Sequence, residues 1–454
     1  MNLWTRLGER GGIALALSLL SLVSSGAPAA RAQEPAPALT LQQALRRALQ
    51  ANASAATARS QVATSQAQLR QLKTSIMPHV DLESSAIRNS EEVAFDVNGF
   101  RATILPRNDW NARLIFSQPL YAGAREFKAL RQARLGVTNA EVGLRSTEDM
   151  VLLATASNYL GIVQGQALVD VEQKNLELAA RRGKQARAFY EAGEQTKVDV
   201  LRVETDTKAA ERALAAAIQS RDLAASRLRL NLALDTLADA PEAPLRVAAP
   251  DLKLPPLPPA ETLVAQAQAN HPSVQQADLA FQIAQLETSK QRAARLPTVR
   301  AEGNVLSQRT SFPASQTASL AIKLTMPIFD SGEISAKVAL AQEHQRQTEI
   351  ALAEAKRQVR EDVLQALLEL KTAETDLALA KEQLAAAEAE YGQSFELYRA
   401  QEATSVDLET SEAALALSRR AVVNGTLNRD LAELNVWSAV GTLKTQILTE
   451  ESTK

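Results

Sequence analysis

The chain has 454 residues, long enough for about three ordinary domains, yet only 4% of them are aromatic. Ala, Leu, Gln and Glu recur throughout, and this composition favours long helices over a compact enzyme core. With 50 basic and 52 acidic residues the formal charge is -2, so the chain lacks the strong positive field that holds a nucleic-acid backbone. The absence of cysteine excludes disulfides, thiolate metal sites, a cysteine nucleophile and a lipid anchor on cysteine.

The first 32 residues have the pattern of an export signal. Arg6 and Arg10 precede an apolar run from Ile13 to Val23, and the small residues of Ala30-Arg31-Ala32 follow where a signal peptidase cuts. We therefore predict a signal peptide over residues 1–32. Because no later stretch approaches about eighteen apolar residues, a membrane crossing by this chain requires a closed β-barrel.

The rest of the chain contains an internal duplication. Three matched pairs mark the two copies: Pro78 and Pro297, Pro119 and Pro327, and Asp199 and Asp407. The spacing falls from 219 residues in the first pair to 208 in the other two, so we expect the first copy to carry a longer insert between its two strands. A Pro-rich stretch over 241–259 separates a first repeat, 33–240, from a second repeat, 260–454.

Beside these prolines the periodicity changes from helical to alternating, which predicts four strands with one apolar and one polar face. The apolar set is Val80, Leu82, Ala86, Ala112, Leu114, Phe116, Val299, Ala301, Val305, Leu320, Ile322, Leu324 and Met326. Such strands fit a barrel with lipid outside and water inside, and on pattern alone they also fit a half-buried sheet in a soluble protein. The signal peptide favours the barrel, as do four aromatic residues expected near strand ends: Trp110, Phe116, Tyr121 and Phe329.

Very long helices are predicted between the strand pairs. Residues 123–193 and 332–401 contain no Pro, and a helix of about 68 residues reaches roughly 100 Å. Within 363–398, apolar residues recur every seven positions with small residues between them, the pattern of a coiled-coil seam. We expect a helix over 40–77 and another over 404–444 to stack end to end beside one long helix.

The order of these features, found twice, resembles the TolC-like outer-membrane efflux proteins over essentially the whole mature chain. It runs from a Leu-x-x-Ala-Leu helix through a strand ending in Gln-Pro-Leu-Tyr to a Gly-Glu-Gln-Thr-Lys-Val-Asp turn. The resemblance implies a mainly α protein with a membrane β-barrel: a homotrimer in which each chain gives four strands to a shared barrel and duplicated helical hairpins to a long α-barrel. Four strands cannot close around water, so several chains must share the barrel.

The resemblance also implies partners at the two turns between long helices, which lie farthest from the barrel. These turns would form the docking surface for a periplasmic adaptor coupled to an inner-membrane transporter. The residues concerned are Gly193, Glu194, Thr196, Val198 and Asp199 in the first turn and Gln401, Glu402, Thr404 and Val406 in the second. Because the second turn has Gln401 where the first has Gly193, we expect the two turns to bind the adaptor unequally.

Asp199 and Asp407 each follow a threonine by three residues, the spacing of a helix capping box. Capping alone accounts for both carboxylates. The resemblance adds for Asp407 a periplasmic gate, where three carboxylates around an axis attract cations and repel anions. Some relatives carry a further acid one helical turn on, where this chain has Thr410, so we expect one acidic ring here.

Catalytic patterns are missing from the sequence. His79, His271 and His344 stand apart, and the chain contains no HExxH helix, GxSxG elbow or P-loop. We interpret these histidines as solvated or capping residues and expect no catalytic residue, metal or cofactor. The densest basic cluster, 181–187, is interpreted as a solvated helix face.

Two functions fit these observations. The first is a passive export duct in the outer membrane, part of a tripartite efflux or type I secretion system. The alternative is a periplasmic or secreted coiled-coil structural protein whose strands form an ordinary soluble sheet. Within the first, multidrug efflux and type I secretion both remain open, and the pump rather than the duct selects the substrate.

Overall fold

The computed structural model describes residues 38–97, 99–234, 245–250, 252, 254–308, 316–400 and 402–448. The predicted signal peptide, 1–32, lies outside the described residues. So do the predicted repeat limits at 33 and 240, and Gln401 of the second turn. The described residues from Ala38 onward belong to one unit of the chain.

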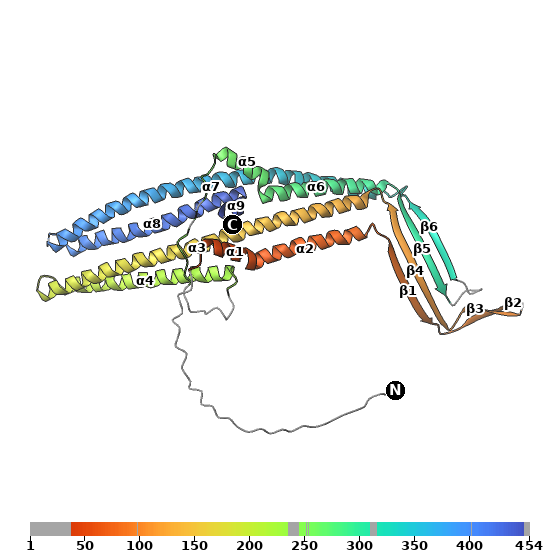
Figure 1. Ribbon diagram of the computed structural model, residues 1–454, viewed down its shortest axis with the longest axis horizontal. Helices are drawn as coiled ribbons and strands as arrows, with labels where there is room; N and C mark the ends of the chain where they lie inside the picture. Colours follow the sequence, from red (N-terminus) through yellow and green to blue (C-terminus); the bar gives the residue numbers. More distant parts are fainter. Residues whose placement is uncertain are drawn as a thin grey trace, which may run out of the picture. The chain divides into compact units, whose positions relative to one another are not determined.

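The first half of this unit places four strands between two pairs of helices (Figure 1). The elements are α1 Leu41–Ala51, α2 Ala53–Thr74, β1 His79–Arg88, β2 Val93–Val97, β3 Phe100–Leu105, β4 Asn108–Tyr121, α3 Arg125–Glu191 and α4 Lys197–Asn231. Thr40 begins α1 with a complete capping box. Asn52, in extended conformation, ends α1 and accepts from the Ser54 backbone N–H to begin α2. The prediction of one helix over 40–77 was therefore wrong, because Asn52 breaks it.

The second half has a similar order of elements. They are α5 Ala260–Asn270, α6 Pro272–Arg292, the short 3-10 helix η1 Ala293–Arg295, β5 Thr298–Gln308, β6 Gln316–Thr325, α7 Glu333–Arg399, α8 Ser405–Val440 and α9 Leu443–Ile447. His271 occupies the place of Asn52: it ends α5 and accepts from the Ser273 N–H at the start of α6. Gly441, at φ 76°, ends α8 in the left-handed conformation. The helix therefore stops at Val440, before the predicted end at 444, and the separate helix α9 follows.

Four strands form one antiparallel sheet in the order β1-β4-β5-β6, while β2 and β3 pair separately in the longer insert predicted for the first copy. Leu114 pairs with Leu82 on one side and with Val305 on the other, so the apolar residues share one face as predicted. Phe116 lies inside β4 opposite Gly303, not near the strand end. Within the described residues, β1 and β6 are the unpaired edges of this sheet.

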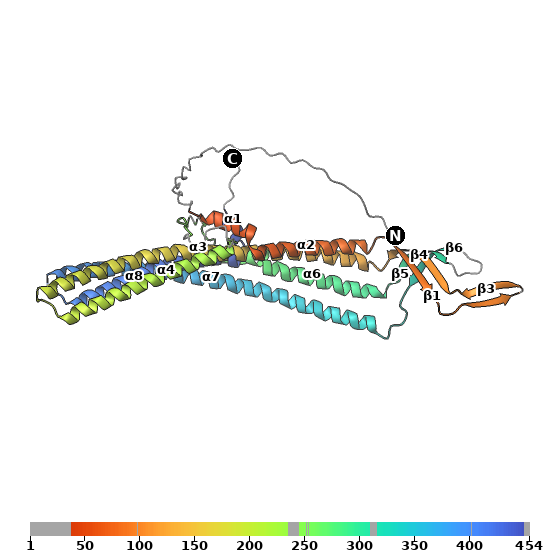
Figure 2. The same ribbon diagram turned by 90° about the horizontal axis from the view of Figure 1, so that it is seen from below.

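The helices lie side by side in two lines beside α3 and α7 (Figures 1 and 2). Along α3, α4 covers one half and α2 the other, and α8 and α6 divide α7 in the same way. The end of α4 meets the start of α2, where Asn52 Nδ2 donates to Asn231 O at 3.3 Å. The end of α8, Gly441, abuts His271 at the start of α6. Stacking therefore joins α2 to α4 and α6 to α8, and the predicted stacking of 40–77 on 404–444 was wrong.

The apolar core gathers where these lines meet, under α1, α5 and α9. Leu45, Leu152, Leu263 and Leu434 are fully buried there. The Tyr159 hydroxyl lies 2.9 Å from Leu39 O and 2.8 Å from Ala248 O, which ties the segments at both ends of the first half to α3.

Helices in the described part of the chain do not combine the length and the apolar character that crossing a membrane requires.

Candidate functional site

The α3–α4 and α7–α8 turns share one backbone hydrogen bond among their described residues. Gly193 has φ 80°, a left-handed value that favours glycine. The Glu194 N–H donates to Phe189 O at 2.8 Å, and in the other turn the Glu402 N–H donates to Leu397 O at 2.9 Å. Val198 and Val406, just inside α4 and α8, are large apolar side chains that remain exposed. The predicted docking residues thus form two exposed ends with apolar side chains.

Both acidic residues of these turns make helix caps. The Asp199 carboxylate accepts from the Thr196 hydroxyl at 2.7 Å and from its N–H at 3.1 Å, and Asp407 accepts from Thr404 at 2.7 and 3.0 Å. The hydrogen bond from the threonine side chain, then that from its backbone, lowers the pKa of each carboxyl below its ordinary value. Both carboxylates therefore stay ionised near neutral pH, and the local geometry does not distinguish Asp407 from Asp199.

The two turns are joined inside one chain. The rings of Phe189 and Tyr398 meet edge to face with centroids 6.1 Å apart. Gln195 Nε2 donates to the Tyr398 hydroxyl at 3.1 Å. Tyr398, the last apolar residue of the predicted seam, is buried and connects the end of α7 to both α3 and the first turn.

A buried ion cluster joins the hairpins above the turns. Arg182 of α3 contacts Asp206 of α4 at 2.6 Å and Glu412 of α8 at 3.1 Å, and only 4% of its side chain is exposed. Burial raises the pKa of Glu412, although the charge of Arg182 acts in the opposite direction. The prediction of a solvated face over 181–187 was therefore wrong for Arg182, because three helices enclose it. Asp206 and Glu412, the acids that Arg182 contacts, are the sequence signal that could have predicted its burial.

A second ion pair links α3 to α8 nearer the core. Arg420 donates to the two carboxylate oxygens of Glu172, at 2.8 Å for one of them, and Glu172 is buried. Burial alone would raise the pKa of Glu172, but hydrogen bonds from Arg420 and Asn175 outweigh it and lower the pKa. Removing Arg420 alone would therefore leave the buried Glu172 carboxylate unpaired.

The histidines do not form a site. His271 caps α6, and its Nδ1 lies 2.7 Å from Ser273 Oγ, while His79 and His344 are exposed. Within the described ranges, no group of three His, Asp or Glu side chains could hold a metal ion.

Residues 44–234 and 263–442 match the family model described as outer membrane efflux protein. These ranges cover well over half of the chain. The chain belongs to the outer membrane efflux protein family. It is accordingly an outer-membrane channel subunit of an efflux system, with a long periplasmic helical part, and not a secreted structural protein.

Individual relatives agree with this placement. The outer membrane efflux protein BepC of Brucella suis biovar 1 (strain 1330) is 24% identical over 329 residues, which are 72% of this chain and 70% of BepC. The Campylobacter jejuni CmeC outer membrane channel superposes with a TM-score of 0.76 at 17% identity, covering 91% of this chain and 87% of CmeC. The open state of the Neisseria gonorrhoeae MtrE outer membrane channel gives 0.74 at 18% identity, with 90% and 91% covered. The efflux-protein fold is thus a TolC-like combination of helical and β-barrel parts.

Proposed function

We propose that three copies of this chain form a passive duct from the periplasm to the exterior, without catalysis of its own. The observation that carries this proposal is the four-stranded sheet, whose β1 and β6 edges are unpaired in the described chain. In lipid every backbone group needs a partner, so each edge must pair with that of another copy. A ring of copies satisfies both edges at once.

The apolar face of the sheet supports lipid as the surroundings of this ring. Val80, Leu82, Leu320 and Ile322 are more than half exposed in the single chain. Arg113 of β4 lies directly across from Glu83 of β1 on the opposite face, where water would fill the duct. Lipid therefore covers the apolar face, and the charged face lines the passage.

At the other end, the two turns form the docking surface for a periplasmic adaptor, which couples the duct to an inner-membrane transporter. The exposed residues Val198 and Val406 supply apolar anchors. Glycine at 193 leaves the first turn uncovered, because a Cβ at this position would meet no heavy atom within 4 Å. Gln401, outside the described residues, stands in the corresponding position of the second turn, so the two turns would bind unequally.

At the same end we assign Asp407 to the periplasmic gate. Its carboxylate is exposed and ionised, so three copies brought around one axis would form a single acidic ring. Thr410, one turn further on, donates back to Val406 O at 2.8 Å and adds no charge.

Substitution of Gly193 tests the docking surface. Gly193→Trp should abolish efflux while the trimer still inserts, because the indole occupies the space that the adaptor needs. Gly193→Ala is the control: it carries the same backbone strain at φ 80° but little bulk, so it should keep most of the efflux. Drug accumulation in cells and outer-membrane trimer on mild gels are the measurements. A fully active Gly193→Trp channel would show that the adaptor docks elsewhere.

A further inference from the structure

The helices of one chain form an open row, as the strands do. Their order is α4, α3, α8 and α7 (Figure 1). Among the described residues, the row ends at α4 on one side and at α7 on the other. The sheet ends likewise at β1 and at β6. In a ring of copies, α7 of one copy meets α4 of the next.

The duplication predicts which residues meet at that junction. The first and second hairpins correspond residue for residue at a spacing of 208: α3 and α7 begin at Arg125 and Glu333 and end at Glu191 and Arg399. The contacts across the α3–α8 junction inside one chain can therefore be transferred to the α7–α4 junction between copies. This transfer rests on the proposed ring of copies.

Transfer of the apolar contact explains two exposed side chains. Inside the chain Phe189 packs against Tyr398. Their counterparts are Leu397 and Tyr190, which are 44% and 46% exposed in the single chain. In the ring these two side chains would cover each other across the boundary between copies.

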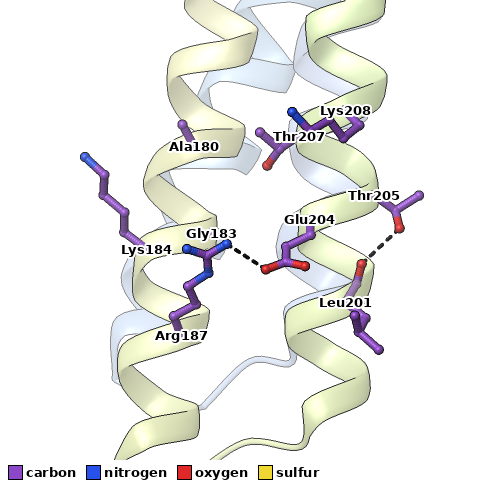
Figure 3. A pocket seen from close by; sticks show the side chains of 9 residues that line it. All are labelled: Ala180, Gly183, Lys184, Arg187, Leu201, Glu204, Thr205, Thr207 and Lys208. Carbon is purple, nitrogen blue, oxygen red and sulfur yellow. Dashed lines mark hydrogen bonds and ion pairs between the residues drawn. The ribbon is translucent and has the colours of Figure 1, made fainter.

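Transfer of the Arg182–Glu412 contact to the α7–α4 junction places different residue types there. Inside the chain Arg182 meets Glu412 at 3.1 Å, and their counterparts are Glu390 and Glu204. Glu204 does not stand alone, because Arg187 reaches across from α3 to contact it at 2.6 Å (Figure 3). Inside the chain, the cation Arg182 is buried between two acids. At the boundary between copies its counterpart is the acid Glu390, which would approach basic residues.

The place that Glu390 would enter is a groove between α3 and α4 of about 710 Å³. Figure 3 shows it with Gly183 and Arg187 on α3 and Glu204 and Lys208 on α4. Lys184 also borders it. Arg187 pairs with Glu204 at 2.6 Å, and Lys208 pairs with Glu211 on its own helix at 2.8 Å, so these three cations exceed the two acids by one positive charge. In the second hairpin the counterparts of Gly183 and Arg187 are Tyr391 and Phe395, whose rings lie 6.0 Å apart. The first hairpin has a glycine and an arginine at these positions. The groove is thus a feature of the first hairpin.

We infer that this groove receives α7 of a second copy, with the Glu390 carboxylate between Arg187 and Lys208 and with Leu397 covering Tyr190. The net positive charge beside the groove matches α7, which carries exposed glutamates at 388 and 390. The apolar contact supplies burial, and the charges fix the register of the two helices.

Cross-linking tests the pairing directly, because the chain has no native cysteine. The variant with Glu390→Cys and Glu204→Cys, treated with a short bismaleimide in outer-membrane vesicles, should give covalent dimers and trimers on a denaturing gel. The control is the variant with Arg182→Cys and Glu412→Cys, whose side chains contact within one chain. This control should react within the chain and run as a monomer.

A charge exchange tests the chemistry of the groove. Glu390→Lys should lower the temperature at which the trimer dissociates in detergent, and adding Lys208→Glu should restore it. Absence of covalent dimers from a protein that is still trimeric, or attachment of Cys-substituted position 204 to an adaptor protein, would overturn the inference and leave the proposed duct intact. A chain that is monomeric in detergent extracts would instead contradict the proposed function itself.

Discussion

Asp199 and Asp407 present the same local structure but different expected roles. Each caps a helix through the threonine three residues before it, with hydrogen bonds of nearly equal length. A cap stabilises its helix wherever the helix lies. A gate, in contrast, depends on where three copies bring the carboxylates together, so the difference between these residues lies in the assembly.

Ion selectivity and divalent-ion block distinguish a gate residue from a residue that only caps its helix. Asp407→Asn should lower the cation selectivity of the channel and its block by divalent ions in planar bilayers, because it removes three negative charges from one ring. Asp199→Asn removes the equivalent cap and should leave selectivity and block unchanged. If the two variants behave alike in both measurements, Asp407 is only a cap and other residues build the constriction.

Asp149 of α3 makes the stability of the chain depend on pH. Burial raises the pKa of this carboxyl from 3.8 to about 6, although the backbone hydrogen bond from Lys444 acts in the opposite direction. Between these values the folded chain holds a proton that the unfolded chain releases, so the contribution of Asp149 to stability falls as pH rises from about 4 to about 6.

Asp149→Asn should therefore remove that part of the pH dependence. The unfolding temperature of the variant, measured by circular dichroism, should rise relative to the parent chain as pH increases from 4 to 7. Asp170→Asn, an exposed acid on the same helix, is the control. A difference between Asp149→Asn and the parent that is constant with pH would contradict the assignment.

At the scale of elements, close approach of α3 to α4 depends on one glycine. A Cβ at Gly165 would lie 2.9 Å from the Cα of Arg221, too close for the backbones to remain where they are. Gly136, on the same helix, has no heavy atom within 4 Å of the equivalent position. An added methyl group should therefore destabilise the helix pair at Gly165 and stabilise α3 at Gly136.

We expect Gly165→Ala to lower the thermal stability of the chain by forcing α3 and α4 apart. Gly136→Ala should raise the free energy of unfolding by about 1 kcal/mol, because alanine is the better helix former and meets no neighbour. Thermal unfolding at 222 nm in detergent compares the two. Equal effects of the two substitutions would show that the α3–α4 distance is not limited at Gly165.

At the scale of the whole molecule, the two faces of the sheet meet different surroundings. Ile322 is 73% exposed on the apolar face in the single chain, and Lys323 lies on the other face beside Arg300. An arginine facing lipid costs roughly 2–4 kcal/mol at the bilayer midplane, whereas a charge facing the lumen is solvated.

Ile322→Arg should thus block assembly in the outer membrane, and Lys323→Glu should not. Trimer recovered from the outer-membrane fraction is the measurement. Leu114→Arg, on the neighbouring part of the apolar face, repeats the first test on another strand. Equal recovery of the lipid-face and lumen-face variants would contradict the barrel.

By itself the sequence determined the repeated elements, because they depend on local patterns. Prolines at 78 and 297 precede strands, alternation defines one apolar face, and the absence of proline permits two helices of 67 residues. The capping boxes at Thr196 and Thr404 were also predicted correctly, since a cap needs only residues three apart.

Tertiary structure alone decided how these elements meet. Asn52 is a residue type that caps helices, but the sequence of 40–77 did not show that it would bind the end of α4. Arg182 stands among basic residues, which predicts a solvated side chain, yet it contacts acids 24 and 230 positions away and is buried. Stacking partners and buried ion pairs join residues far apart in the chain, and only packing selects among the many possible partners, because the energy of such contacts depends on burial and distance rather than on sequence order.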